Sequence, residues 1–433
     1  MKHLHLIGLG TGNENFLTIE AKSALINAEI IFGARRILEI AARSLSKVET
    51  GEKSKNLPKT EPLYNAKEIL SYLKENPQYQ NVAVLFSGDV GFFSGAKGFY
   101  KEFQNEKEIP DEWDLNAIPG ISSAVYFASK LQKSWQNWKF LSLHGSKCNT
   151  IEQIRKNPAC FFILSGGKDT ETVLQKIKLA HKNGILPSVK CWLGENLSYP
   201  DEKIYEVSLG ETKSFEKNGL FVLLVENETA KYCPITPFLN NEDFIRTEKI
   251  PMTKKEIRRL SVMALGLSEN SVVYDIGSGT GSVTVEAARL ATSGQVFAVE
   301  CKEEAFELTH KNVSKFCLEN VTCILGNAPD CLKNQNLPSP THVFVGGSRG
   351  NLSEIVEFVL QKNPKVRIVA NFVSLENLCE MQSLLKNLES KDKIENIEIT
   401  QVMVSHAEKA GEFHLMKAQN PVYIVNFSGK CDE

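Results

Sequence analysis

The chain has 433 residues, which is too long for one ordinary hydrophobic core and predicts two or three domains. Its composition, with 42% hydrophobic and 24% charged residues, is typical of a soluble globular protein, and a formal net charge of −2 gives no indication of a nucleic-acid or membrane partner. No stretch approaches the roughly 20 apolar residues that cross a bilayer, and the apolar run after Lys2 reaches glycines at once, so we expect a first β-strand there rather than a signal peptide.

From residue 2 to about residue 129, apolar runs alternate with helix-like stretches. Strands are predicted at residues 4–8, 29–32, 82–86 and 115–118, and helices at 18–27, 34–44, 94–103 and 122–130. This rhythm predicts a mostly parallel sheet with helices on its faces. The following section is richer in strands, and its last two runs, "KIYEVSL" and "GLFVLLVEN", could pair antiparallel. We expect residues 1–227 to form one α/β unit with two lobes.

Residues 228–249 are polar, contain two prolines, and are interpreted as a linker. After them the rhythm restarts. Helices are predicted at residues 253–265, 282–291 and 303–316, and strands at 272–276, 296–300, 321–325, 342–345, 366–370, 397–404 and 422–427. This pattern predicts a second, doubly wound α/β domain over residues 250–433.

The ten cysteines are scattered, with no C-x-x-C pair, and no H-E-x-x-H motif occurs. Neither a metal site nor a disulfide framework is therefore indicated, and a reducing cytoplasm is the expected compartment.

Two strands run into glycine-rich loops, "GLGTG" at residues 8–12 and "GSGTG" at residues 277–281. Glycine permits close approach of a ligand, and the N-terminus of a following helix offers unpaired N–H groups. The strand "VFAVE" after the second loop ends at Glu300, which can accept hydrogen bonds from ribose hydroxyls. The third glycine of the dinucleotide pattern G-x-G-x-x-G is replaced by Asn13 and Ser282, which favours S-adenosylmethionine over a nicotinamide dinucleotide in the second domain. A tight turn without a ligand is the alternative.

Ordered motifs in each half resemble two known families. The second half resembles the decarboxylating precorrin methyltransferase domain through "PMTKKEIR", "DIGSGTGSVTVE", "GNAP", "VFVGGSRGNLSEI" and "NFVSLEN". The first half resembles the tetrapyrrole methylases (class III) through "GLGTGNENFLT", "FSGDVGFFSG", "PGISS", "SLHG" and "GENLSYPDEKI". Together the motifs cover nearly the whole chain and resemble the family of fused precorrin C5,15-methyltransferases (decarboxylating).

The resemblance implies an α/β fold in which a two-lobed tetrapyrrole methylase domain (residues 1–227) precedes a Rossmann-like (class I) methyltransferase domain (residues 250–433). It implies a cytoplasmic, homo-oligomeric enzyme of cobalamin biosynthesis that uses S-adenosylmethionine and no metal. Its substrate would be an anionic tetrapyrrole, a reduced precorrin-6, methylated at position 5 by the first domain. The second domain would methylate position 15 and remove carbon dioxide from the ring C acetate.

The resemblance also assigns cofactor-binding residues, in the first half Gly8, Gly10, Gly12, Gly88, Asp89, Ser122 and Ser123, and in the second half Thr253, Gly277, Ser278, Gly279, Thr280, Gly281, Glu300, Asn327 and Ala328. Some positions depart from the family pattern. Asn13 and Val90 replace expected prolines or acids, Ser146 replaces an arginine, and Asn327 replaces an aspartate, so that its amide would be a weaker acceptor for adenine.

Candidates for assistance to catalysis are Lys254, Glu256, Arg258 and Arg349. Lys254 and Arg258, four residues apart, could instead belong to a solvated helix face. Thr253 and Glu256 also have the spacing of a helix capping box, a purely structural alternative. Arg349 lies in the turn "GGSRG" after a strand, where open α/β sheets bind ligands, and arginines there could hold carboxylates by paired hydrogen bonds. The alternatives to a methyltransferase are an NAD(P)-dependent oxidoreductase and a non-catalytic corrinoid-binding protein.

Overall fold

The computed structural model describes residues 1–46, 58–106, 112–143, 148–209, 215, 219–230, 238–333 and 335–431. Parts of the motif "SLHG" and of the interpreted linker, as well as Ser146, lie outside the described residues. The chain forms two compact units. Unit 1 comprises Met1–His144, Ala159–Thr172 and Lys190–Glu226, and unit 2 comprises Gly145–Pro158, Val173–Val189 and Asn227–Glu433.

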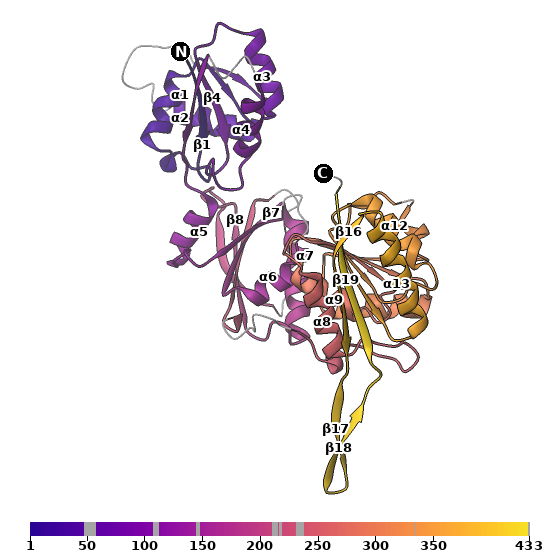
Figure 1. Cartoon of the computed structure of the whole chain (residues 1–433). Coiled ribbons are helices and arrows are strands. Elements are labelled where there is room, and N and C mark those ends of the chain that lie inside the picture. The colour runs from indigo at the N-terminus through magenta and orange to yellow at the C-terminus, as the bar shows by residue number, and fades with distance from the viewer. Residues whose placement is uncertain are drawn as a thin grey trace. The chain divides into compact units, whose positions relative to one another are not determined.

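The first sheet of unit 1 has five strands in the order β3-β2-β4-β1-β5, all parallel. The strands are β1 (Lys2–Gly8), β2 (Ile30–Phe32), β3 (Lys59–Glu61), β4 (Asn81–Phe86) and β5 (Trp113–Ile118). The helices are α1 (Ile19–Asn27), α2 (Arg35–Ser46), α3 (Ala66–Glu75), α4 (Ala96–Asn105) and α5 (Ser123–Leu131). Figure 1 shows α1 and α2 on one side of this sheet and α3 and α4 on the other. The predicted parallel sheet is confirmed, although β3 and α3 were not predicted.

The second sheet of unit 1 has the order β6-β7-β10-β8-β9. Its strands are β6 (Lys139–Ser142), β7 (Ala159–Leu164), β8 (Val189–Glu195), β9 (Lys203–Val207) and β10 (Phe221–Asn227). The predicted pairing of the last two runs is wrong, because β9 pairs antiparallel with β8 while β10 pairs antiparallel with β7. The physical reason is burial: the continuous apolar run of β10 suits the middle of the sheet, whereas the partly exposed β9 forms its edge.

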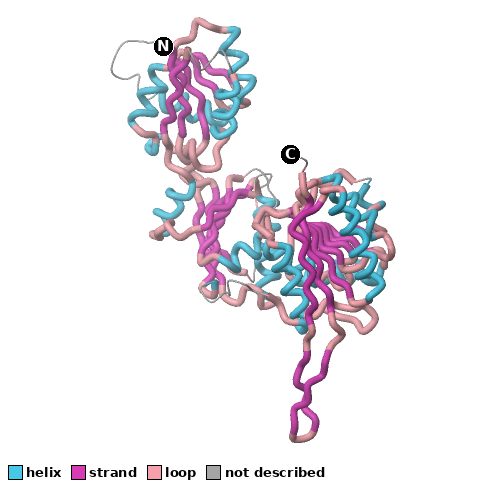
Figure 2. The backbone as a smooth tube through the Cα atoms, viewed as in Figure 1, coloured by secondary structure: helices cyan, strands magenta, loops and turns pink. Residues whose placement is uncertain are grey.

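Unit 2 contains a seven-stranded sheet with the order β13-β12-β11-β14-β15-β19-β16. Its strands are β11 (Val272–Ile276), β12 (Gln295–Glu300), β13 (Val321–Leu325), β14 (His342–Val345), β15 (Arg367–Phe372), β16 (Ile394–Val402) and β19 (Val422–Gly429). The first five are parallel, and β19 runs antiparallel to both of its neighbours, β15 and β16. The predicted second doubly wound domain is therefore confirmed, and Figure 2 shows its strands side by side.

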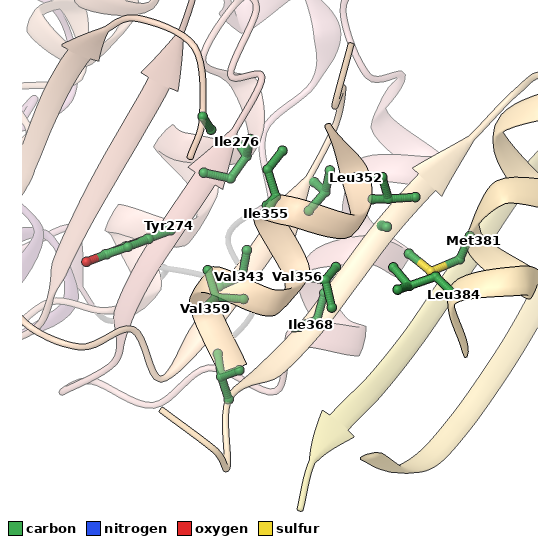
Figure 3. Packing of buried hydrophobic residues seen from close by; sticks show 14 of the residues in the cluster. Tyr274, Ile276, Val343, Leu352, Ile355, Val356, Val359, Ile368, Met381 and Leu384 are labelled. Atoms are coloured by element: carbon green, nitrogen blue, oxygen red, sulfur yellow. The ribbon is translucent and has the colours of Figure 1, made fainter. Parts of the chain in front are cut away.

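Both faces of this sheet are covered by helices. They are α8 (Lys255–Leu265), α9 (Ser282–Leu290), α10 (Glu303–Lys315), α11 (Asp330–Lys333), α12 (Leu352–Lys362) and α13 (Leu375–Ser390). Within β14, Val343 packs in the core formed with α12 and α13 (Figure 3), as does Val345. Phe344 packs in the core that includes Ile257 of α8. Strands buried on both faces read as continuous apolar runs, and this made them predictable from the sequence.

A hairpin of β17 (Ser405–Ala410) and β18 (Phe413–Ala418) projects from the end of the unit 2 sheet (Figure 1). Every residue of both strands is exposed. Unit 2 also contains α6 (Thr150–Lys156), while α7 (Gly167–Lys182) crosses the boundary between the two units in the sequence. Among the described helices, none combines the length and apolar character that a bilayer span requires.

Candidate active site

The loop at residues 277–281 connects the carboxyl end of β11 with α9. Gly277, Gly279 and Gly281 have φ angles of +74°, +59° and +73°, a conformation that residues with a Cβ rarely adopt. A Cβ on Gly277 would lie 2.8 Å from both the backbone N and the backbone O of Gly347, just after β14. The loop is therefore shaped by a close approach of two backbone segments that glycine permits.

Glu300, the last residue of β12, lies beside this loop. Its Oε2 accepts a hydrogen bond from the N–H of Gly279 at 2.9 Å, and its Oε1 accepts from the N–H groups of Cys301 and Lys302, each at 2.9 Å. Glu300 is 8% exposed and contributes to the wall of a cavity. The structure thus brings together the acid and the glycine loop that the sequence analysis assigned to successive strands.

The cavity has a volume of about 970 Å³. Its wall is formed by residues 249–254 before α8, by the glycine loop, by residues 300–302 and by the base of the β17–β18 hairpin. Of the predicted site residues, the wall contains Thr253, Gly277, Ser278, Gly279, Thr280, Glu300 and Arg349. Gly281 lies deeper, as the N-cap of α9 packed against Thr309.

A smaller cavity of about 30 Å³ adjoins the first, because both are lined by Gly277, Cys301, Gly347 and Arg349. Asn327 and Ala328 line this second cavity, and the carbonyl oxygen of Ala328 accepts a hydrogen bond from the amide of Asn351 at 3.2 Å. The residues assigned to adenine therefore lie next to the glycine loop.

Arg349 is exposed and has a φ of +51°, which is unusual for a residue with a side chain. Backbone strain of this kind costs about 1–3 kcal/mol and is concentrated at functional sites. Because Arg349 lines both cavities, its guanidinium is available to an anionic group bound in either of them.

The wall also contains basic side chains that were not singled out in the sequence, Lys249, Lys302, His406 and Lys417, together with the predicted candidate Lys254. They come from four separate segments, and Lys417 forms an ion pair with Glu408 at 3.1 Å within the hairpin. No local sequence pattern distinguishes these residues from ordinary surface charges. They come together at one cavity only because the fold places their segments side by side.

Arg258 is fully buried and does not belong to the cavity wall. Its Nη1 donates to the carbonyl of Thr253 at 2.8 Å, its Nη2 donates to the carbonyl of Leu239 at 2.8 Å, and its Nε lies 3.4 Å from Glu286. Burial lowers the pKa of Arg258, and Glu286 opposes this effect. A side chain without exposed surface cannot touch a substrate in this arrangement, so the geometry gives Arg258 a place behind the wall.

Glu256 lies in the first turn of α8, and its Oε1 is 3.4 Å from Nε2 of His406, a residue of the cavity wall. The capping box considered for this helix is not formed. The N-cap residue is Lys254, which makes no side-chain capping bond, because the chain remains extended through residue 254 and the helix begins one residue later than the box requires.

Asp275 precedes the glycine loop and is 1% exposed. The hydroxyl of Thr284 donates to its Oδ2, whereas its Oδ1 has no hydrogen-bond partner among the described residues. Burial raises the pKa of Asp275 to about 7, against the effect of the Thr284 hydrogen bond. In the sequence, Asp275 stands out only as the first residue of the motif "DIGSGTGSVTVE".

The residues predicted in unit 1 lie at the carboxyl ends of β1, β4 and β5. A Cβ on Gly8 would lie 2.7 Å from the carbonyl of Gly88, and Gly10 and Gly88 exchange two backbone hydrogen bonds. Asp89 accepts hydrogen bonds from the N–H groups of Gly91 at 2.8 Å and Gly120 at 3.1 Å. The three strand ends are therefore in contact through glycine backbone, and Asp89 joins the end of β4 to the end of β5 through its hydrogen bond from Gly120.

The other two features of this region serve local structure. Ser122 is the N-cap of α5, since its Oγ accepts from the N–H of Val125 at 3.3 Å, and Ser123 begins that helix. Gly12 lies under the ring of Tyr199, where a Cβ would meet ring atoms at 2.6–2.9 Å. The hydroxyl of Tyr199 in turn accepts a hydrogen bond from Arg36.

Comparison with known proteins matches each half of the chain to a family. Residues 245–428 match the model described as the precorrin methyltransferase domain, and residues 3–213 match that of the tetrapyrrole (corrin/porphyrin) methylases. A probable cobalt-precorrin-6B C(15)-methyltransferase (decarboxylating) from Pyrobaculum calidifontis is 38% identical over 192 residues, which are 44% of this chain and 95% of that protein. A protein of the same description from Methanocaldococcus jannaschii is 35% identical over 43% of this chain and 94% of its own length.

Among solved structures, a precorrin-6y C5,15-methyltransferase from Geobacter metallireducens GS-15 is 32% identical. The alignment covers 44% of this chain and 96% of that one, with a TM-score of 0.40.

Proposed function

This chain belongs to the family of decarboxylating precorrin methyltransferases, and from that premise we propose that it methylates positions 5 and 15 of a reduced precorrin-6 and decarboxylates its ring C acetate. Membership makes it a C-methyltransferase of cobalamin biosynthesis, which leaves the oxidoreductase and the non-catalytic protein without support. The observation that carries the proposal for position 15 is the carboxylate of Glu300 held at 2.9 Å from the N–H of Gly279 on the wall of a large cavity.

We propose S-adenosylmethionine as the methyl donor of both halves. The unit 2 residues fit it: the glycine loop brings residues 277–280 to the cavity wall, Glu300 offers a carboxylate to ribose hydroxyls, and Ala328 and Asn327 line the adjoining small cavity. When bound, this cofactor supplies a methyl group already activated on a sulfonium. The protein residues then need to position the acceptor carbon and exclude water, since no metal or covalent nucleophile is required.

The proposed substrate is a tetrapyrrole with many carboxylates, and the cationic wall suits it. Arg349 can form paired hydrogen bonds with a carboxylate, whereas Lys254, Lys302 and Lys417 act as point charges. Thr253 lines the wall between these groups. Arg258, behind Thr253, is assigned a positioning role, and Glu256 is assigned a role through its contact with His406.

Decarboxylation requires an electron sink in the substrate. We propose that a proton added to the conjugated ring system provides this sink. The bond between the acetate carboxylate and its methylene carbon then breaks, carbon dioxide leaves, and the electron pair enters the conjugated system. The electron-rich carbon 15 accepts the methyl group and a proton is returned to solvent. Methylation at position 15 is thus expected to depend on loss of the carboxylate.

For the first half, we propose that the strand ends joined through Gly8, Gly88 and Asp89 form the site of methylation at position 5. The residues assigned with them are Gly10, Gly12, Ser122 and Ser123. By function, we divide the chain into residues 1–227 and 250–433 with residues 228–249 between them. The two family matches, at residues 3–213 and 245–428, support this division.

We further propose that the enzyme is a cytoplasmic homo-oligomer. The β17–β18 hairpin supports self-association, because its apolar side chains Phe413, Leu415 and Met416 are each at least 62% exposed. Large apolar side chains seldom cluster on a surface that stays free in solution, so such a cluster indicates an interface.

The proposal is tested by incubating the chain with S-adenosylmethionine and reduced precorrin-6, with and without cobalt, and weighing the products. Two methyl gains and one carbon dioxide loss are expected. Gly10→Val and Gly279→Val should each abolish one methylation and spare the other, since each places a side chain in a loop of positive φ. Loss of both methylations from either variant would contradict two separate sites. A calorimetric titration with NAD(P) in place of S-adenosylmethionine should show no binding.

A further inference from the structure

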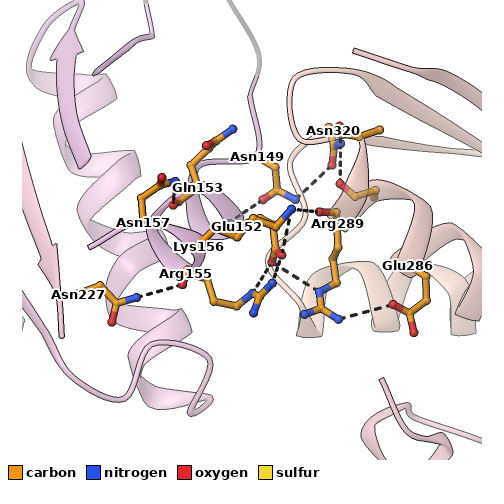
Figure 4. A network of polar contacts seen from close by, with 12 residues as sticks. Asn149, Glu152, Gln153, Arg155, Lys156, Asn157, Asn227, Glu286, Arg289 and Asn320 are labelled. Atoms are coloured by element: carbon orange, nitrogen blue, oxygen red, sulfur yellow. Dashed lines mark hydrogen bonds and ion pairs between the residues drawn. The ribbon is translucent and has the colours of Figure 1, made fainter. Parts of the chain in front are cut away.

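Helix α6 follows β6 in the chain but belongs to unit 2 by its contacts. The N–H of Asn149 donates to the carbonyl of Thr292 at 2.9 Å, and the N–H of Thr150 donates to Glu319 at 2.6 Å. The Asn149 side chain also meets Asn320, whose amide donates to carbonyls of α9 and the turn after it (Figure 4). A helix within the tetrapyrrole methylase match is therefore bonded to the turn after α9 and to the loop before β13, both within the precorrin methyltransferase match.

Within unit 2, side chains of opposite charge alternate from α6 through α9 to α8. Glu152 of α6 lies 3.5 Å from Arg289, Arg289 lies 3.7 Å from Glu286, and Glu286 lies 3.4 Å from Arg258 (Figure 4 shows the first three). Glu152 is also bound by Arg155 through a 2.8 Å hydrogen bond. The chain of charges thus runs from α6 to the arginine behind the cavity wall.

All four side chains are buried, with exposures of 5% for Glu152, 8% for Arg289, 3% for Glu286 and 0% for Arg258. A buried charge is energetically costly unless it is paired. When one partner is removed, the side chain that it paired with is therefore expected to form a new ion pair with another nearby charge. Burial raises the pKa of Glu286 in spite of its two arginine neighbours, while at Glu152 the arginines outweigh burial and the pKa is lowered.

The last two residues in this row of buried charges, Glu286 and Arg258, contact the segments that form the wall of the candidate site. Glu286 Oε1 accepts from the N–H of Leu239 at 2.8 Å, and Arg258 donates to the carbonyls of Leu239 and Thr253. Thr253 belongs to residues 249–254, which line the cavity, and the carbonyl of Pro251 lies 3.5 Å from where a Cβ of Gly279 would be. The position of this segment therefore depends on the pair of Glu286 and Arg258.

We propose that Glu152 is a positioning residue for the position-15 methyltransferase site. Its carboxylate pairs with Arg289, so that Glu286 remains paired with Arg258. Arg258 in turn binds the carbonyl of Thr253 and so fixes residues 249–254 beside the glycine loop. The proposal rests on the proposed function. Its key geometric point is that Arg289 is shared almost equally between Glu152 and Glu286, at 3.5 and 3.7 Å. Without the carboxylate of Glu152, Arg289 turns to Glu286 and competes with Arg258 for it.

The test compares Glu152→Gln with Glu319→Gln in the full-length chain. Glu319 accepts from Thr150 and pairs with Lys176, so its loss loosens the same helix without touching the charge chain. We expect Glu152→Gln to raise the calorimetric Kd for S-adenosylmethionine and its KM at position 15 by about threefold to thirtyfold, the range for changes along a coupling network. Glu319→Gln and the KM for methylation at position 5 should change less than twofold.

A double variant separates positioning from simple docking of α6. In Glu152→Gln/Arg289→Met the competing cation is gone, so Glu286 remains paired with Arg258 and the Kd for S-adenosylmethionine should return to within about twofold of wild type, the limit set for the control. If Glu152 served only to attach α6 to the rest of unit 2, the double variant would bind S-adenosylmethionine at least as weakly as Glu152→Gln does. If Glu152→Gln does not fold, the double variant and Arg289→Met alone, both expected near wild type, carry the test.

The outcomes are distinguishable from failure of the proposed function. A wild-type chain that binds no S-adenosylmethionine would overturn the function itself. A wild-type chain that binds it, together with an unchanged Kd in Glu152→Gln or an equal rise in Glu319→Gln, would overturn the positioning role alone.

Discussion

Gly277→Ala is the substitution whose consequence the structure defines most closely. The residue has a φ of +74°, and a Cβ there would lie 2.8 Å from the backbone N and O of Gly347. The left-handed backbone costs an alanine about 1–2 kcal/mol. The clash is with backbone, which cannot rotate away, and overpacking of this kind costs about 1–3 kcal/mol more. The expected loss in free energy of unfolding is therefore about 2–5 kcal/mol.

Gly266→Ala provides a matched control. Gly266 ends α8 with a φ of +65°, but a Cβ there would have no neighbour within 4 Å. The control carries only the backbone term, about 1–2 kcal/mol. The difference between the variants, about 1–3 kcal/mol, isolates the close approach, and in a unit of this size it corresponds to about 2–12 °C in Tm.

The assay uses the placement of the tryptophans. Trp113, Trp135, Trp138 and Trp192 are the four tryptophans of the chain, and all belong to unit 1. Tryptophan fluorescence therefore follows unit 1, whereas far-ultraviolet circular dichroism follows both units. Gly277→Ala should lower a dichroism transition more than Gly266→Ala does and should weaken S-adenosylmethionine binding, which the control retains. Equal shifts in both variants would refute the close-approach argument.

Three further predictions concern unit 2. Because the pKa of Asp275 is raised to about 7, the folded state binds a proton that the unfolded state releases near pH 4, so this residue's contribution to stability falls as the pH rises from 4 to 7, by up to about 4 kcal/mol. Asp275→Asn should flatten the profile of Tm against pH in that range, and an unchanged slope would assign it to other groups. Arg349→Ala should raise the KM for the tetrapyrrole about tenfold or more, as loss of a charge-assisted pair implies, without changing the Kd for S-adenosylmethionine; the reverse pattern would place Arg349 on the cofactor. Leu415→Ser with Met416→Ser should lower the mass measured by light scattering if the hairpin mediates self-association, whereas an unchanged mass would exclude that surface.

Much of unit 2 could be predicted because its central strands are buried on both faces. The buried strands β11 and β14 have the bounds expected from their apolar runs, as does the partly exposed edge strand β13, and the turn at residues 277–281 follows from glycine spacing. Some short or exposed elements were missed: β3 and β17 carry little apolar signal, and the apolar residues of β18 are exposed rather than part of a core. Periodicity reports burial, so an element without a buried face leaves no pattern.

The sequence by itself determined the alternation of strands and helices, the two glycine loops and the acid at the end of β12, since each depends on residues near one another in the chain. The tertiary structure decided which strands are neighbours, as in the insertion of β10 between β7 and β8. It also decided that Arg258 lies behind the cavity wall, that Lys417 of the hairpin reaches the wall, and that Glu152 contacts Arg289. These contacts join segments far apart in the sequence, and no local spacing can specify them because they depend on how buried surfaces pack and how buried charges find partners.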